Sequence, residues 1–243
     1  MAETKYMVIL ANSIRNEKRC VAGKELIRNP GRGWRIGPWI RLAHPGDPEG
    51  AVPFESTVCP EHGPVRPLDV VQLGVRSPCN NPDHPEDWWL DGDVGWQFVE
   101  RFSHDALSML ADKPHRLWHD RFPDAVSAGY IPRMGKHASS ICLIKAPVSW
   151  EFAFWKEPAP VYNCPGQMKE KKHLRLTFQH AGICHDCSVT DPEFTRRHDI
   201  FNRIQPEKQT LAIARAADAF FCLSLTLTFN SKHYKICATV FEP

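Results

Sequence analysis

The 243-residue sequence lacks several features that would assign it to a familiar class. It has no apolar run near the 18 or so residues that span a bilayer, and the start, Met1 to Tyr6, lacks the charged-then-apolar order of a secretory signal. It also has no nucleophile elbow and no Walker loop. Gly31-Arg-Gly33 is too short to be a dinucleotide-binding glycine turn. We therefore expect a cytoplasmic protein without a membrane partner, a cofactor or a complete set of catalytic residues.

A strong overall charge is also missing, since the net charge is only +2. The charge is nevertheless uneven: residues 1–41 carry nine Lys or Arg and three acids, whereas residues 42–100 carry two and eleven. Local patches, rather than the total charge, would have to attract phosphate. The nine cysteines are an odd number scattered among apolar neighbours, which is typical of reduced core residues.

Short apolar runs separated by proline-rich and glycine-rich loops predict a mostly β protein. In the first half the runs form one barrel of about five strands, and in the second half six runs form another small barrel or sandwich. The first-half runs are 6–11, 19–24, 39–42, 68–75 and 87–90, and the second-half runs are 140–146, 150–155, 174–180, 183–189, 220–229 and 234–241.

A different period follows the first set of strands, where Val94, Phe98 and Phe102 recur every fourth residue. This spacing predicts a helix over about 94–112, which Pro114 ends. We therefore predict two small β-barrels joined by a helix-containing connector. The expected boundaries are 1–103 for the N-terminal barrel with its closing helix, 104–138 for the connector and 139–243 for the C-terminal barrel.

Several short motifs follow one another along the chain. They are Ile9-Leu-Ala-Asn-Ser13, Arg19-Cys-Val-Ala-Gly23, Trp39-Ile-Arg41, Leu68-Asp-Val-Val71 and Pro85-Glu-Asp-Trp-Trp-Leu90, followed by Phe178-Gln-His-Ala-Gly182, Ser188-Val-Thr-Asp-Pro192, Leu223-Ser-Leu225 and Tyr234-Lys235. In this order they resemble the prokaryotic dual OB-containing domain family. The resemblance implies two OB-like barrels in one bacterial protein, with nucleic-acid or nucleotide binding by analogy of fold. Leu42-Ala-His44 and the Asp of Pro-Glu-Asp-Trp depart from the family pattern, so a pocket there would take a different ligand.

Metal binding has two weak candidates. Cys184-His-Asp-Cys187, with His180 nearby, has the spacing of a zinc knuckle, but positions i and i+3 of a strand face opposite sides. Cys59, His62, Cys79 and His84 form a second, generic cluster in irregular loops. Structural roles are favoured for both sets, and the acidic stretch from Asp83 to Asp93 is interpreted as a solvated loop.

Ligand binding is predicted for the basic N-terminal strands, where arginines alternate with tryptophans. OB barrels bind single strands or nucleotides by combining a basic groove with rings that stack on bases. The predicted ligand-binding residues are Asn12, Ser13, Arg15, Arg19, Trp34, Trp39 and Arg41. In the alternative interpretation, Trp39 fills the barrel, the arginines only increase solubility, and Asn12 and Ser13 cap a loop.

The sequence therefore favours a binding module for single-stranded nucleic acid or a nucleotide-derived ligand, and one setting for it is a bacterial conflict or defence system. Two alternatives stay open at this stage. One is a metal-dependent enzyme acting on nucleotides through Cys, His and acidic loop residues. The other is a protein-interaction component without its own ligand, whose basic face contacts a partner's acidic surface.

Overall fold

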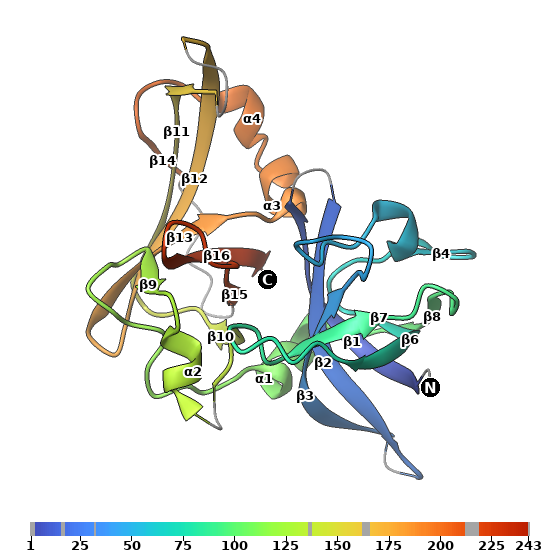
Figure 1. Cartoon of the computed structure of the whole chain (residues 1–243). Coiled ribbons are helices and arrows are strands. Elements are labelled where there is room, and N and C mark those ends of the chain that lie inside the picture. The colour runs from blue at the N-terminus through green and yellow to red at the C-terminus, as the bar shows by residue number, and fades with distance from the viewer. Residues whose placement is uncertain are drawn as a thin grey trace.

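The computed structural model shows two β-rich units that lie side by side, with the C-terminal end of the chain between them (Figure 1). It describes residues 3–15, 18–31, 33–135, 138–161, 166–211 and 219–242, apart from the side chain of Arg15. Strands dominate and the helices are short, as the sequence predicts. In chain order the elements of the first unit are β1 (Glu3–Arg15), β2 (Lys18–Asn29), β3 (Gly33–Ala43), η1 (Phe54–Thr57), β4 (Val58–Cys59), β5 (Gly63–Pro64), β6 (Asp69–Pro78), β7 (Asp87–Leu90) and β8 (Gln97–Arg101).

The first unit is a closed barrel of five strands. Its strands follow the order β1-β2-β3-β7-β6, and β6 pairs back onto β1 to close the sheet, while β8 adds to the outer edge of β6. The β3–β7 pair is parallel and the other pairs around the barrel are antiparallel. This order, with one parallel contact between the third and fifth strands, is that of an OB-fold.

The second unit repeats this order. After η2 (His104–Ala106) and α1 (Leu107–Leu110), its elements are β9 (Ala125–Ser127), α2 (Tyr130–Arg133), β10 (Ile141–Lys145), β11 (Trp150–Pro160), β12 (Met168–His180), β13 (Ile183–Val189), α3 (Pro192–Arg197), α4 (Ile200–Arg203), β14 (Gln209–Leu211), β15 (Phe220–Leu225) and β16 (Lys232–Phe241). The sheet runs β10-β15-β16-β13-β12-β11, with a parallel β13–β16 pair, and β14 extends it beyond β11. Because β10 and β11 follow each other along the chain, they act as one interrupted first strand.

Strand β1 shows why the two units stay together. Met7 and Ile9 point into the core of the first barrel, whereas Val8 and Leu10 point to a cluster shared with the second unit. A strand that is buried on both faces has a continuous run of apolar residues in its sequence, and β1 has one in Tyr6-Met-Val-Ile-Leu-Ala11. Gly23 on β2 lets the two strands approach here, since a Cβ at this position would collide with the carbonyl oxygen of Val8.

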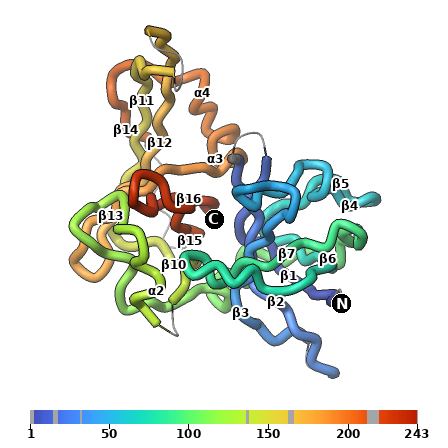
Figure 2. The backbone as a smooth tube through the Cα atoms, in the orientation of Figure 1, coloured from blue at the N-terminus to red at the C-terminus, as the bar shows by residue number. Residues whose placement is uncertain are grey.

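The shared cluster is a third core between the units. From the first barrel it takes residues of β1 and β2, and from the second unit Ile141, Leu143, Phe220 and Cys222, with Leu107 of α1 between them. Strand β16 lies beside β1 along this contact, as the tube in Figure 2 shows. Burial of these apolar groups joins the two units through a continuous hydrophobic interface.

The predicted helix over 94–112 is wrong for most of its length. Residues 97–101 form strand β8, which pairs with β6, and the helical structure begins only at His104. Val94, Phe98 and Phe102 recur at every fourth position, as in a helix, but the free edge of β6 offers this segment backbone hydrogen bonds as a strand. The last apolar residues of the pattern are helical, and Leu107 and Leu110 are fully buried.

Each of the predicted strand runs coincides with a strand of the structure, although the run from Phe220 ends at Leu225. The connector also supplies a strand, since β9 pairs with β16. None of the helices in the described part of the chain has the length and apolar sequence needed to cross a membrane. The eight cysteines that the structure describes are free thiols, and five of them are buried.

Candidate functional site

A cavity of about 430 Å³ lies between the two units. The first barrel contributes Ser13 from β1 and Arg41 from β3, together with His84 from the loop before β7. The second unit contributes Ser224 and the segment between β15 and β16. A β-bulge in β1 between Ile9 and Ala11 shifts the register, so that Ala11 and Ser13 turn to this side of the barrel.

Arg41 is held in the wall of this cavity by two carboxylates. Its Nη2 donates to Glu86 Oε1 and to Ser140 Oγ, its Nε lies 2.9 Å from Asp87 Oδ1, and its Nη1 lies 3.4 Å from Ser224 Oγ. The Arg41 side chain is only 13% exposed. Burial alone would lower the pKa of Arg41, but Glu86 and Asp87 outweigh it and raise the pKa. The guanidinium therefore links the units and carries no uncompensated charge.

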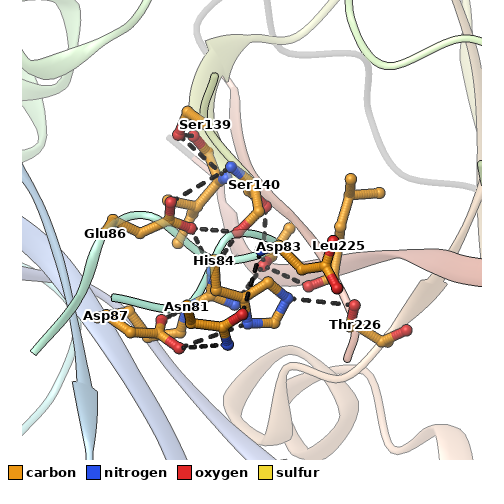
Figure 3. A network of polar contacts seen from close by, with 12 residues as sticks. Asn81, Asp83, His84, Glu86, Asp87, Ser139, Ser140, Leu225 and Thr226 are labelled. Atoms are coloured by element: carbon orange, nitrogen blue, oxygen red, sulfur yellow. Dashed lines mark hydrogen bonds and ion pairs between the residues drawn. The ribbon is translucent and has the colours of Figure 1, made fainter. Parts of the chain in front are cut away.

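The segment before β7 carries further contacts between the units (Figure 3). Glu86 accepts hydrogen bonds from the hydroxyl and the backbone N–H of Ser140, the second at 3.4 Å. His84 Nε2 lies 3.2 Å from the carbonyl oxygen of Thr226. Burial, and then the charge of Arg41, lower the pKa of His84, so the neutral ring donates this hydrogen bond.

The middle of the acidic stretch is therefore not the solvated loop that the sequence suggested, although Asp93 at its end is exposed. Glu86, Asp87 and Asp91 are all less than a tenth exposed. Arginines on neighbouring strands explain the difference, because Arg41 neutralises the first two and Arg76 Nη2 lies 3.1 Å from Asp91 Oδ1. Buried carboxylates need such partners, and the sequence gives no sign of which arginine will face them.

Trp39 is neither a barrel-core residue nor an open contact surface. It packs against the shared cluster, and its indole Nε1 donates to Asp112 Oδ2 at 2.9 Å. Asp112 also accepts from Lys24 Nζ at 2.6 Å and from the backbone N–H of Leu143 at 2.9 Å. This aspartate follows α1, so Trp39 and Lys24 belong to the contact between the units.

The other predicted residues are dispersed. Asn12 donates to the carbonyl oxygen of Val65 at 2.8 Å, and its own Oδ1 is buried without a partner among the described residues. The guanidinium of Arg19 lies 5.0 Å from the ring centre of Phe54, and burial lowers the pKa of Arg19. The side chain of Arg15 lies outside the described part of the chain. Of the predicted set, the structure brings together Ser13 and Arg41 at the cavity.

Trp34 lies on the outer side of the first barrel, where it and Tyr6 also pack against the shared cluster. Its ring centre lies 5.1 Å from that of Tyr6, and the guanidinium of Arg28 lies 5.4 Å from Trp34 and 4.9 Å from Tyr6. Arg28 stands directly opposite Trp34 on the β2–β3 hairpin, and Arg35 beside it is exposed. Sequence reasoning missed Tyr6, although recognising the turn at Pro30-Gly31 would have paired Arg28 with Trp34.

The metal candidates do not assemble. Cys184 is exposed and Cys187 is buried, so they face opposite sides of β13, as strand geometry predicts. His180 Nε2 lies 3.1 Å from the carbonyl oxygen of Pro114. Among the residues that the structure describes, no three Cys, His, Asp or Glu side chains gather in a way that could hold a metal.

Comparison with known families identifies the chain. A model of the dual OB-containing domain matches residues 5–240. The chain belongs to the dual OB-containing domain family. No curated protein matches it at a significant level. Membership in the dual OB-containing domain family agrees with the repeated strand order of the two units and with an OB-type binding module. The departure from the family pattern at Asp87 lies beside the cavity, through its contact with Arg41.

Proposed function

We propose that this dual OB-containing domain protein binds single-stranded nucleic acid across the outer face of β2 and β3 in the first barrel. The observation that carries the proposal is the cluster of Tyr6, Arg28 and Trp34. The face of the second and third strands is the one through which OB-folds bind oligonucleotides. Rings supply stacking surfaces for bases there, and guanidinium groups contact the backbone.

The charges on this face support nucleic acid as the ligand. Arg28 contacts rings rather than carboxylates and forms no ion pair with any described residue, and the one carboxylate bonded to the cluster is Glu100, which accepts from Trp34 Nε1 at 2.5 Å. Arg41 and Lys24, by contrast, are neutralised at the contact between the units. Phosphate binding needs uncompensated positive charge. We therefore propose Arg28 and Trp34 as contact residues, in place of the predicted Arg41 and Trp39.

The test is a fluorescence-anisotropy titration of labelled, mixed-sequence DNA and RNA 20-mers at 50 and 200 mM salt. Trp34→Ala removes one stacking surface, which is worth about 1 to 3 kcal/mol per base, so we expect affinity to fall by roughly 5- to 150-fold. Arg28→Ala should reduce the slope of log K against log salt by about 0.7, the value for one phosphate contact on a single strand.

The matched control is Arg133→Ala, which removes an exposed arginine from α2 in the second unit. It should leave the affinity within twofold of the wild type. The proposal is wrong if the wild type shows no affinity at 50 mM salt, or if Trp34→Ala and Arg28→Ala bind as the wild type does. A role in a bacterial conflict or defence system stays a prediction that rests on the family resemblance.

A further inference from the structure

We propose that the cavity between the units binds a small, uncharged, planar heterocycle of nucleoside size. This site is separate from the nucleic-acid face proposed above and is argued from different residues. Ligand pockets commonly have volumes of roughly 300 to 1,000 Å³ and lie between domains. The cavity has a volume of about 430 Å³, and both OB-like units line it.

The charge of the lining argues against a phosphorylated ligand. Arg41 is the single Lys or Arg among the described residues that line the cavity. Glu86 and Asp87 already neutralise its guanidinium, and Glu49 adds another carboxylate to the lining. His84 is neutral there, because burial and Arg41 lower its pKa. A phosphate entering this cavity would lose its hydration without gaining an available cation.

The walls suit a flat, uncharged ring. Most of the lining side chains are apolar, among them Ile14, Ile141, Leu227, Phe229 and Ile236. The hydroxyl groups of Ser13, Thr190 and Ser224 also line the cavity. An apolar pocket with a few convergent polar groups is the usual arrangement for small-molecule recognition.

Ser13 supplies the clearest unused hydrogen-bonding group. It is 1% exposed, and its hydroxyl makes no hydrogen bond with another described residue. Thr190 Oγ1 makes only a long contact of 3.5 Å with the carbonyl oxygen of Cys237. A hydroxyl can both donate and accept, so these groups can pair with the mixed donor and acceptor edge of a nucleobase. A ligand bound in the cavity would supply hydrogen-bond partners to these two hydroxyls.

Binding at this site would also stabilise the contact between the units. The lining includes Ser13 from β1 and Ser224 from β15, so the intact site requires both units in place. A ligand that binds only the folded arrangement raises the unfolding temperature by mass action. Thermal stabilisation is therefore a readout that accompanies direct binding.

The experiment uses the full chain with four nucleosides, adenosine, guanosine, cytidine and uridine, and with their 5′-monophosphates. Isothermal titration calorimetry measures affinity and stoichiometry. We expect at least one nucleoside to bind in a one-to-one ratio, to raise the unfolding temperature, and to bind at least tenfold more tightly than its monophosphate. Absence of binding by all four nucleosides, or tighter binding of the monophosphates, overturns the proposal.

Two variants locate the site. Ser13→Leu fills the cavity from β1, and Leu227→Trp narrows it from a half-buried position in the segment after β15, where folding is less at risk. A folded variant of either kind should lose at least tenfold in nucleoside affinity, and wild-type affinity in a folded Leu227→Trp protein refutes the assignment. Oligonucleotide binding should survive in Leu227→Trp, and nucleoside binding should survive in Trp34→Ala, so the two proposals fail independently.

Discussion

Replacing Arg41 with Ala should destabilise the protein strongly without removing a nucleic-acid contact. The substitution leaves Glu86 and Asp87, whose side chains are 5% and 10% exposed, without the guanidinium that neutralises them. Removing one partner of a buried ion pair costs about 3 to 5 kcal/mol, because an uncompensated buried charge remains. The hydrogen bonds from Arg41 to Ser140 and Ser224 across the contact between the units are lost as well.

The assay is urea and thermal unfolding of the wild type and Arg41→Ala, followed by circular dichroism. For a chain of this size, 1 kcal/mol corresponds to a shift of about 2 to 4 °C, so the unfolding temperature should fall by roughly 6 to 20 °C. Arg35→Ala is the matched control on the same strand, because Arg35 is exposed. It should change the stability by less than about 0.5 kcal/mol.

The free energy of unfolding should therefore fall by several kcal/mol in Arg41→Ala and stay nearly unchanged in Arg35→Ala, and this contrast tests the structural role of Arg41. A loss of less than about 1 kcal/mol in Arg41→Ala would show that the network around Glu86 contributes little to stability. Oligonucleotide affinity is measured below the unfolding temperature of the variant. If folded Arg41→Ala protein has lost that affinity, Arg41 contacts the nucleic acid. Either result would refute the structural role that we assign to it.

Two further predictions concern buried polar groups of the second unit. Burial, and then the charge of Lys235, lower the pKa of His185 from 6.5 to about 3, so only the unfolded chain takes up this proton between pH 7 and 5. Stability should therefore fall by about 2 kcal/mol from pH 7 to pH 5, and urea unfolding of His185→Gln should show this dependence reduced by that amount; an unchanged dependence contradicts the prediction. Asp191 caps α3 by accepting from the N–H groups of Glu193 and Phe194 at 2.8 and 3.0 Å, and also accepts from Val240 N–H at 2.9 Å. Asp191→Ala should lower the free energy of unfolding by roughly 2 to 4 kcal/mol and Asp191→Asn by less, and equal losses in both would argue against the capping role.

Local patterns in the sequence predicted the strands because alternating or continuous apolar residues show in a short window which segments have a face to bury. The apolar run from Tyr6 to Ala11 needs burial on both faces, and β1 has it. The spacing of Cys184 and Cys187 placed their thiols on opposite faces of β13, as observed. The prediction of a helix over 94–112 was wrong because residues 97–101 pair as a strand with β6, whose edge the local spacing does not reveal.

The candidate site depends on contacts that no local pattern contains. The sequence by itself determined a mostly β chain, its strand positions and an order of motifs that resembles the dual OB-containing domain family. Only the tertiary structure decided that Arg41 pairs with Glu86 of its own barrel and bonds to Ser140 of the second unit, while Arg28 stays exposed. The two arginines look alike in the sequence, since alternation along a strand gives the face of a side chain but not what covers that face. Both arginines lie on the face of the β2–β3 pair that also carries Ala22 and Leu26. The second unit covers the end of that face near Arg41 and leaves Arg28 exposed, and this separates the stabilising arginine from the proposed binding one.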